Sequence, residues 1–331
     1  MSEVHVIVPE GIDDPARPSG GNTYDRHVCR GLAALGWAVH EHTVSGAAAL
    51  AGAVRRIPDG AVVLLDGLIA SGAPETLVPH SRRLRQVVLV HMPLGDARER
   101  AVLEAAAAVV TTSGWARRRL GELYGLPADW VHVAEPGVDR APLAPGTAAG
   151  DELLCVAALT PGKGHDVLFD ALAAMTNESW NCTCVGSVVR DPAWADRVRR
   201  RAVDDRVRFT GALVGPELDR AYASADLLVL ASHGETYGMV VTEALARGLP
   251  VLAADVGGVT EALGHGKDGT RPGLLVPPGD PAALGAALRT WLGDAQLRGR
   301  LRRAARERRA SLRQWPATTS VLAGVLAGAA R

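Results

Sequence analysis

Lysine is scarce in this sequence, because only Lys163 and Lys267 among its 36 basic residues are lysines. Cysteine is scarce as well, and four cysteines in 331 residues do not form the paired framework of a small disulfide-stabilised secreted fold. No apolar run approaches the ~20 residues that a membrane-spanning helix needs. A charge excess is also lacking, since 36 basic residues balance 36 acidic ones. This balance argues against a dedicated nucleic-acid-binding protein, which needs a basic surface to contact phosphates.

The remaining composition is that of a globular protein. Hydrophobic residues make up 47% of the chain and charged residues 22%, and 331 residues are enough for two domains. No secretory signal precedes the first apolar run, so we expect a cytoplasmic protein with reduced thiols. Arginines gather at 82–85 and 117–119, which leaves peripheral contact with acidic lipids open beside the simpler interpretation of solvated helix faces.

Short apolar runs alternate with helical stretches, such as Thr23–Leu35 and Asp166–Met175, along the whole chain. This alternation is typical of parallel sheets built from strand-helix-strand units. In the first half we expect strands at Val4–Val8, Val39–Val44, Ala61–Leu65, Val87–His91, Ala108–Thr111 and Trp130–Ala134. In the second half we expect them at Leu153–Leu159, Cys182–Gly186, Val207–Thr210, Leu227–Ala231, Val251–Ala254 and Gly273–Val276.

A stretch rich in Pro, Gly and Ala at 136–150 separates the two halves and predicts a linker. The expected domains are therefore residues 1–145 and 146–311, with a final helix at 312–331 that packs back on the first domain. Each domain is expected to be a doubly wound α/β sheet. Ligands of such sheets bind beyond the carboxyl ends of the strands, and two such domains facing each other form a central cleft.

Two glycine-containing loops follow predicted first strands. Lys163 lies between Gly162 and Gly164, where an ammonium at a strand end can reach a phosphate as a point charge. Its retention in an arginine-dominated sequence favours a functional role over a plain turn. Gly20 and Gly21 precede a helix, where backbone N–H groups and the helix dipole favour an anion. A flexible loop before a helix explains the glycine pair equally well.

The most informative stretch is residues 232–244, which contains Glu235 and Glu243 with seven residues between them. If most of that span is helical, the two carboxylates stand roughly 12 Å apart along the axis. That is too far for the acid and nucleophile of a retaining hydrolase, which sit about 5 Å apart. The separation suits the two ends of a long ligand, with a helix N-terminus near Gly238 directed at a diphosphate between them.

These residues resemble a known family, the retaining glycosyltransferases of the GT-B fold, typified by bacterial mannosyl-, glucosyl- and N-acetylglucosaminyltransferases. The family's Glu-x7-Glu motif is matched by Glu235 and Glu243, and its Lys-Gly pair by Lys163 and Gly164. Further similar stretches are Gly20-Gly21, Thr112-Ser113-Gly114-Trp115, Pro136-Gly137-Val138-Asp139, Ala225-Asp226-Leu227, Gly248-Leu249-Pro250-Val251, Asp255-Val256-Gly257-Gly258 and Gly273-Leu274-Leu275-Val276. The resemblance covers nearly the whole chain.

The resemblance implies an acceptor-side first domain and a second domain that binds a nucleotide sugar. Catalytic roles fall to His91 beside the transferred sugar, Lys163 at the diphosphate and Glu235 at the sugar hydroxyls, while Glu243 contacts the ribose. The implied donor-binding residues are Gly20, Gly21, Lys163, Gly164, Glu235, Thr236, Tyr237, Gly238, Met239, Val240 and Glu243.

The implied reaction is retaining transfer of a glycosyl group from a nucleotide diphosphate sugar, UDP- or GDP-linked, to an unidentified acceptor. We expect no cofactor and no metal ligands, because no Asp-x-Asp motif follows a strand and Asp13-Asp14 is a bare pair in a loop. Two alternatives are an epimerase or phosphorylase of the same fold and a non-catalytic nucleotide-sugar-binding protein. The second is favoured by Ala158, which stands where the family usually has arginine. The base, the sugar, the acceptor and the oligomeric state are not encoded in any motif.

Overall fold

A computed structural model describes residues 2–202 and 205–331. The chain forms two compact units. Unit 1 comprises Met1–Ile12, Gly20–Gly137 and Arg313–Arg331, and unit 2 comprises Asp13–Ser19 and Val138–Leu312. The expected linker at 136–150 contains no helix or strand, and the change of unit falls between Gly137 and Val138 within it.

Unit 1 contains a six-stranded parallel sheet with the strand order β2-β1-β3-β4-β5-β6. Four central strands are apolar along most of their length, as expected for a sheet covered on both faces. The strands are β1 (Glu3–Pro9), β2 (Ala38–Val44), β3 (Val62–Asp66), β4 (Arg85–Val90), β5 (Ala108–Thr111) and β6 (Val131–Val133).

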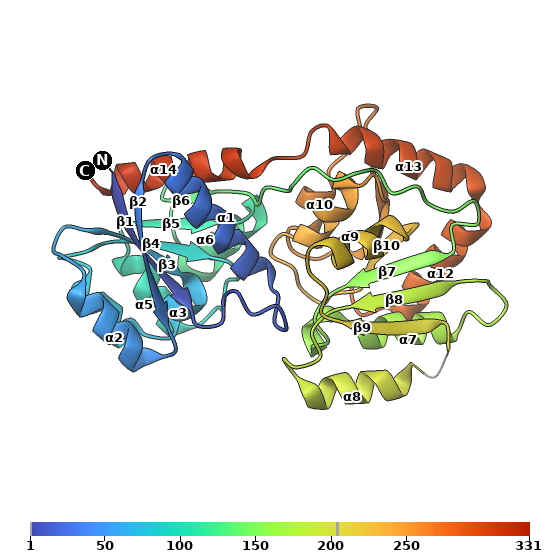
Figure 1. Cartoon of the computed structure of the whole chain (residues 1–331), viewed down its shortest axis with the longest axis horizontal. Coiled ribbons are helices and arrows are strands. Elements are labelled where there is room, and N and C mark those ends of the chain that lie inside the picture. Colours follow the sequence, from blue (N-terminus) through green and yellow to red (C-terminus); the bar gives the residue numbers. More distant parts are fainter. Residues whose placement is uncertain (1, 203–204) are drawn as a thin grey trace. The chain divides into compact units, whose positions relative to one another are not determined.

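Helices cover both faces of this sheet (Figure 1). Helices α1 (Gly20–Ala34) and α14 (Trp315–Ala329) pack against each other, and α14 also contacts β3, β4 and β5. The opposite face forms a core that includes Ile7, Leu50, Leu65, Leu103 and Leu120. The helices of that face are α2 (Ala47–Arg56), α3 (Gly67–Ser71), α4 (Pro74–Leu77), α5 (Ala97–Ala105) and α6 (Gly114–Tyr124).

Unit 2 contains a second six-stranded parallel sheet with the order β12-β11-β10-β7-β8-β9. Alternate residues of each strand enter two different cores, since successive side chains point to opposite faces. The strands are β7 (Glu152–Val156), β8 (Asn181–Val185), β9 (Val207–Gly211), β10 (Leu227–Leu230), β11 (Val251–Ala254) and β12 (Gly273–Val276).

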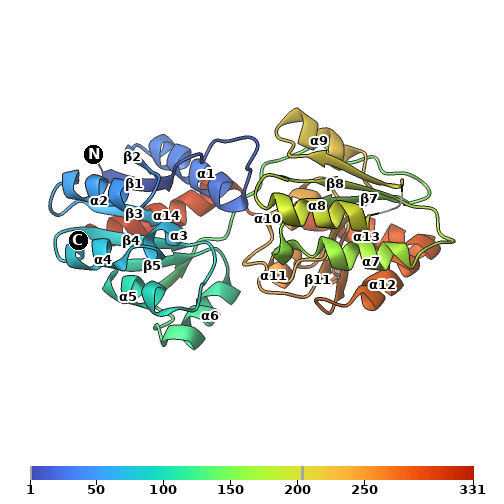
Figure 2. The same ribbon diagram turned by 90° about the horizontal axis from the view of Figure 1, so that it is seen from below.

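The helices of unit 2 lie on both faces of its sheet (Figure 2). One core joins Leu153 and Val229 to helices that include α7 and α12, and the other joins Leu154 and Leu228 to helices that include α9 and α10. The helices are α7 (His165–Ala173), α8 (Pro192–Arg201), α9 (Pro216–Ala223), α10 (Met239–Ala246), α11 (Val259–Leu263), α12 (Pro281–Gly293) and α13 (Ala295–Arg309).

The predicted fold class, two doubly wound Rossmann-like α/β domains, is confirmed, and every expected strand is present with small shifts at its ends. The largest shift is in β7, which ends at Val156 although the apolar run predicted a strand to Leu159. Ala157 and Leu159 still donate backbone hydrogen bonds to Val185 and Ser187, so the chain stays extended beyond the regular ladder.

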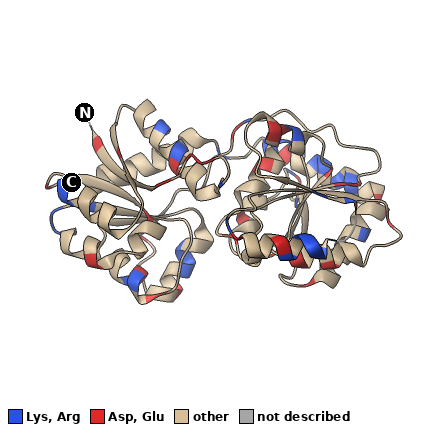
Figure 3. Ribbon diagram, turned by 60° about the horizontal axis from the view of Figure 1, so that its bottom comes forward, with Lys and Arg blue, Asp and Glu red and all other residues tan. Residues whose placement is uncertain are grey.

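Charged residues of both signs are interleaved along the ribbons of both units (Figure 3). Helix α13 is rich in arginine, a composition that predicts a solvated face, but two of its arginines bond to backbone carbonyl oxygens. Arg298 is buried and donates to carbonyl oxygens of Trp291 and Leu292, and Arg309 donates to those of Ala141 and Ala246.

Across the described residues, none of the helices combines the length and apolar character needed to cross a bilayer.

Candidate functional site

Each sheet has one point at which the strand order reverses. In unit 2 this point lies between the neighbouring strands β7 and β10, and in unit 1 it lies between β1 and β3. Ligands of open α/β sheets bind beyond the carboxyl ends of the strands at such a point. Lys163 follows β7 and Glu235 follows β10, so the fold places both predicted catalytic residues of unit 2 at its reversal point.

The loops after β7 and β10 are joined by an ion pair. The Lys163 ammonium donates a hydrogen bond of 2.6 Å to Oε1 of Glu235, and the Ser232 hydroxyl donates to the same oxygen at 2.8 Å. Among the described residues, no hydrogen bond or ion pair involves Oε2 of Glu235. An ammonium has three donors and Lys163 is partly exposed, so both partners keep hydrogen-bonding capacity for a ligand.

Glycines make this close approach of loops sterically feasible. Gly164 has φ 65°, and a Cβ there would lie 1.9 Å from the carbonyl oxygen of Ala231. Gly257, after β11, has φ 55°, and a Cβ there would lie 1.8 Å from the carbonyl oxygen of Glu235. The next residue, Gly258, donates its N–H to that oxygen at 2.9 Å. The backbone on both sides of Glu235 is therefore fixed by contacts that other residues would block.

Helix α10 begins directly after this loop. Gly238 has φ 91° and precedes the first helical residue, Met239, and no side chain caps the helix. The first N–H groups of a helix have no partner within it, and together with the helix dipole they favour an anion. The N–H groups of Met239 and Val240 are in this position, and Thr236 and Tyr237 complete the loop that leads to them. The predicted helix start near Gly238 is confirmed.

The separation expected for Glu235 and Glu243 needs a correction. The estimate of roughly 12 Å assumed that most of the intervening span is helical. Only the part from Met239 onward is helical, because the left-handed conformation of Gly238 cannot belong to an α-helix. Glu235 therefore lies in the loop and Glu243 in the helix, and the helical rise does not set their distance.

Glu243 accepts a hydrogen bond from a neighbouring helix, α9. The Tyr222 hydroxyl in α9 donates a hydrogen bond of 2.7 Å to Oε2 of Glu243. The Arg247 guanidinium lies 4.4 Å from the centre of the Tyr222 ring. Burial raises the pKa of Glu243, while the Tyr222 hydrogen bond and the Arg247 charge oppose that increase. Sequence reasoning did not single out Tyr222, because no local pattern shows that α9 meets α10.

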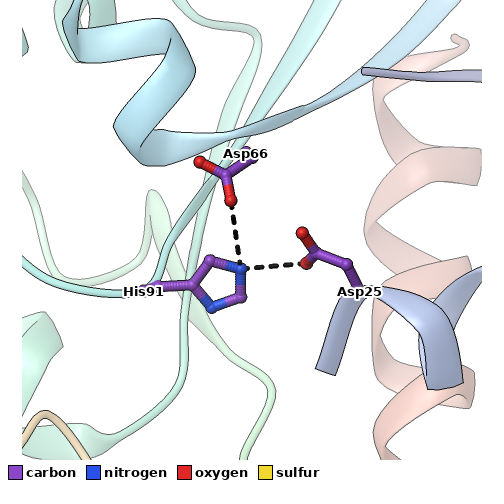
Figure 4. Close-up of side chains that lie close together, drawn as sticks. All are labelled: Asp25, Asp66 and His91. Atoms are coloured by element: carbon purple, nitrogen blue, oxygen red, sulfur yellow. Dashed lines mark hydrogen bonds and ion pairs between the residues drawn. The ribbon is translucent and has the colours of Figure 1, made fainter. Parts of the chain in front are cut away.

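The candidate residues of unit 1 form a separate group. His91 follows β4, and its Nε2 lies 2.9 Å from Oδ1 of Asp25 and 3.8 Å from Oδ2 of Asp66 (Figure 4). A Cβ on Gly21 would lie 3.4 Å from Cδ2 of His91. Gly20 and Gly21 form the first turn of α1, whereas the sequence predicted a helix only from Thr23. The structure thus brings Gly21 and His91 into contact, beside two acids that sequence reasoning missed.

The two acids shift the pKa of His91. Burial disfavours the charged imidazole, but the charge and hydrogen bond of Asp25 and the charge of Asp66 outweigh burial and raise the pKa of His91. Burial raises the pKa of Asp66, which also accepts backbone hydrogen bonds from Leu68 and Ile69. Asp66 could have been predicted as a candidate, because it is an acidic residue at the end of an apolar strand. Asp25 has no comparable signal in the sequence.

A metal ion is one ligand that this group in unit 1 could hold. Asp25, Asp66 and His91 each offer one ligand atom within 4.8 Å of the others. Oδ2 of Asp25 is buried and makes no hydrogen bond within the described part of the chain. The same contacts serve equally well to hold a protonated imidazole between two carboxylates. The expectation of no metal remains a prediction.

Ala158, where the resembling family usually has arginine, lies in the loop that carries Lys163. It is half-buried, and its carbonyl oxygen accepts the N–H of Thr160 at 2.8 Å. A Cβ on Gly186 would lie 2.9 Å from the backbone nitrogen of Ala158, so the loops after β7 and β8 are also closely packed.

Comparison with known proteins gives matches on several levels. Residues 150–294 match the family of group 1 glycosyl transferases. A D-inositol 3-phosphate glycosyltransferase from Jonesia denitrificans is 35% identical over 251 residues, which cover 69% of this chain and 58% of the relative. A glycogen synthase from Mycobacterium tuberculosis is 33% identical over 233 residues, covering 67% and 54%. The matched regions thus span little more than half of these relatives.

Solved structures resemble the whole chain. A sucrose-phosphate synthase from Thermosynechococcus elongatus has a TM-score of 0.81 at 22% identity and covers 99% of both chains. HepE from Anabaena, solved in complex with UDP-glucose, has a TM-score of 0.77 at 18% identity, covering 99% of this chain and 100% of its own. At these identities the likeness concerns the fold, which is of the GT-B class. Residues 150–294 form a domain of the group 1 glycosyl transferase family.

Proposed function

We propose that this chain transfers a glycosyl group from a nucleotide diphosphate sugar to an acceptor. The observation that carries the proposal is the Lys163–Glu235 ion pair at the reversal point of the unit 2 sheet, beside the uncapped start of α10. An ammonium and helix N–H groups suit a diphosphate, and a carboxylate oxygen suits sugar hydroxyls. The match of residues 150–294 to group 1 glycosyl transferases supports the same chemistry.

Each residue has a distinct proposed role. Lys163 and the N–H groups of Met239 and Val240 bind the diphosphate, Oε2 of Glu235 accepts from a hydroxyl of the transferred sugar, and Glu243 binds the ribose. In unit 1, Gly21 and His91 keep the roles that the resemblance implied, donor binding and contact with the transferred sugar. Asp25 and Asp66 orient His91 and raise its pKa against the opposing effect of burial.

The proposed reaction retains the configuration at the sugar carbon. The bond from that carbon to the diphosphate oxygen breaks, and its electron pair stays on the diphosphate. The acceptor hydroxyl forms the new bond on the same face and loses its proton to the leaving group. The main demand is stabilisation of the charge that develops on the diphosphate, which fixed donors meet electrostatically.

Binding and turnover should be measured separately. A thermal-shift series with UDP, GDP, ADP and TDP identifies the base, because a ligand that binds the native state raises the melting temperature. A labelled nucleotide sugar with that base is then incubated with and without candidate acceptors. Binding without any release of diphosphate would favour the non-catalytic binding protein over the transferase. The comparisons do not support the epimerase alternative.

We expect Glu243→Gln to weaken donor binding about tenfold while changing the turnover number little. A charged hydrogen bond contributes about 1.5–3 kcal/mol, and a ribose contact is equally strong in ground and transition states. Initial rates over a donor series give KM and kcat. Tyr222→Phe is the matched control, because it removes only the hydroxyl that orients Glu243. A large fall in kcat with unchanged KM would contradict the ribose assignment.

Transfer is expected to continue at an unchanged rate in excess EDTA. Lys163 and helix N–H groups neutralise the leaving diphosphate in this proposal, so no bridging cation is needed. The rate is measured after prolonged incubation with EDTA and again after addition of Mg²⁺ or Mn²⁺. Loss of activity that either metal restores would show that the reaction depends on a divalent ion.

A further inference from the structure

Unit 1 contains a cavity at the point where the strand order of its sheet reverses, between β1 and β3. Pro9 and Glu10 at the end of β1, Val44 at the end of β2 and Leu68 after β3 line it, together with residues of α2 and α3. Its volume is about 450 Å³, within the range of roughly 300–1,000 Å³ that is usual for small-molecule sites. Ligands of open α/β sheets bind at such a point, so the cavity has the position of a binding site.

Apolar side chains form most of the cavity wall. Val44 and Leu50 belong to the hydrophobic core of unit 1, and α3 adds Leu68 and Ile69. Leu68 is a large hydrophobic residue, yet 50% of its surface is exposed. A ligand that covers this surface removes it from water, which is favourable in proportion to the apolar area buried. The wall therefore favours a ligand with an apolar portion.

The charge of the wall excludes one class of ligand. Among the described residues that line the cavity, Glu10 is the charged one, and no lysine or arginine is present to pair with an anion. Helix α2 begins at Ala47 without a side-chain cap, and its N–H groups favour negative charge, but the cavity already contains the carboxylate of Glu10. A phosphate or carboxylate on the ligand would meet a like charge. The N–H groups and the Ser45 hydroxyl instead suit the hydroxyl of an uncharged ligand.

One carboxylate connects the cavity wall to the group around His91. Oδ1 of Asp66 accepts the backbone N–H groups of Leu68 and Ile69 at 2.7 Å and 3.1 Å, and its Oδ2 lies 3.8 Å from Nε2 of His91. A displacement of this part of the wall would therefore strain the contacts that position His91.

The loop after β4 also exposes large hydrophobic side chains. Met92 and Leu94 follow His91 and are exposed on 53% and 41% of their surfaces. Single exposed hydrophobic residues are ordinary, but Leu68, Met92 and Leu94 lie in the segments that follow two neighbouring strands, β3 and β4. Such a concentration of exposed apolar surface is typical of an interaction site.

We propose that this cavity binds the acceptor and that the acceptor is an uncharged alcohol with an apolar portion. The inference rests on the proposed function, because glycosyl transfer needs a second substrate with a hydroxyl group. The nucleotide sugar is assigned to Lys163 and Glu235 at the reversal point of unit 2, and the second substrate is assigned to the reversal point of unit 1. An alkyl or aromatic group of the acceptor packs against Leu50, Leu68 and Ile69.

A fluorescent apolar probe tests the cavity without any glycosyl transfer. N-phenyl-1-naphthylamine is uncharged, and its emission rises in apolar surroundings. We expect one saturable site on the full chain, and we expect Leu68→Asp to weaken binding about tenfold through the loss of apolar contact. Leu35→Asp is the matched control, because Leu35 follows α1 in the same unit, is exposed on 53% of its surface and does not line the cavity. Absence of binding, or equal affinity in Leu68→Asp and wild type, would overturn the proposal.

Two competitors with the same alkyl chain test the charge preference. We expect 1-octanol to displace the probe at about tenfold lower concentration than octyl phosphate does, because the phosphate meets Glu10. Glu10→Gln changes an exposed side chain and should improve displacement by octyl phosphate while leaving 1-octanol unchanged. Displacement by octyl phosphate at an equal or lower concentration in wild type would overturn the uncharged class, and an unchanged difference in Glu10→Gln would overturn the role of Glu10.

Inhibition connects the cavity with the acceptor. The probe has no hydroxyl group, so we expect a saturating concentration of it to suppress transfer without reducing the additional thermal shift that the nucleoside diphosphate causes. Transfer at an unchanged rate with the cavity filled would overturn the acceptor assignment. Absence of transfer under all conditions would contradict the proposed function, whereas the two titrations would still decide whether the cavity takes an uncharged apolar ligand.

Discussion

Replacing Lys163 with alanine is expected to lower the rate of glycosyl transfer by about 10²–10³-fold, as loss of a single preorganised donor at a developing negative charge does in other enzymes. Lys163 contributes the ammonium at the carboxyl end of β7, and its removal also leaves Glu235 without its cationic partner. We expect Lys163→Arg to be poor too, since a broad guanidinium fork does not replace a compact ammonium. Single-turnover rates with a saturating nucleotide sugar measure the effect on chemistry.

The chain supplies a matched control for this variant. Lys267 is its other lysine, and it lies in an exposed loop where, among the described residues, its backbone N–H is bonded to Glu307 and its ammonium has no partner. Lys267→Ala makes the same chemical change and should leave the rate unchanged. A Lys163→Ala variant with a near-normal rate would remove Lys163 from the site and with it the observation on which the proposed function rests.

Replacing Asp226 with alanine is expected to destabilise unit 2 by about 3–5 kcal/mol, the usual cost of removing one partner of a buried ion pair. Asp226 is fully buried at the start of β10. It pairs with Arg302 of α13 at 2.6 Å, and it accepts from both the N–H and the hydroxyl of Thr147 at 2.6 Å and from the N–H of Glu152. One carboxylate thus fastens the linker, β7 and α13 together.

Denaturant unfolding followed by intrinsic tryptophan fluorescence, to which Trp291 contributes with six other tryptophans, measures this loss. Trp291 is fully buried in unit 2, and the Arg302 guanidinium lies 5.9 Å from the centre of its ring. Asp268→Ala removes an exposed carboxylate that accepts one backbone hydrogen bond from Thr270, and it should change stability by only about 0.5 kcal/mol. A loss below about 1 kcal/mol in Asp226→Ala would mean that Arg302 finds another partner when the carboxylate is removed.

Sequence patterns were sufficient for the fold because the relevant information is local. A buried parallel strand is a continuous apolar run, and each of the twelve runs became a strand. The start of α10 was also predictable, since Gly238 adopts a conformation that ends one element and begins the next. The glycines at 164 and 257 show why the motifs around them contain glycine, because a Cβ at either position would collide with a carbonyl oxygen.

The number of helical residues between Glu235 and Glu243 was not predicted correctly from the sequence. Gly238 indicated where the helix begins, but the distance estimate still treated most of the span from 235 to 243 as helical. The contact between Gly258 and the carbonyl oxygen of Glu235 holds the first part of that span as a loop. A tertiary contact therefore overrode a plausible local preference.

The sequence by itself determined the two sheets and the loops that follow their central strands, and it singled out Lys163, Glu235 and Glu243 as the candidate site residues. Only the tertiary structure paired Lys163 with Glu235, surrounded His91 with Asp25 and Asp66, and brought the ends of β1, β2 and β3 together around one cavity. The first group depends on periodicity and turn chemistry, which neighbouring residues specify. The second depends on strand register and helix packing, which join residues far apart in the chain and are set by the burial of the whole apolar surface.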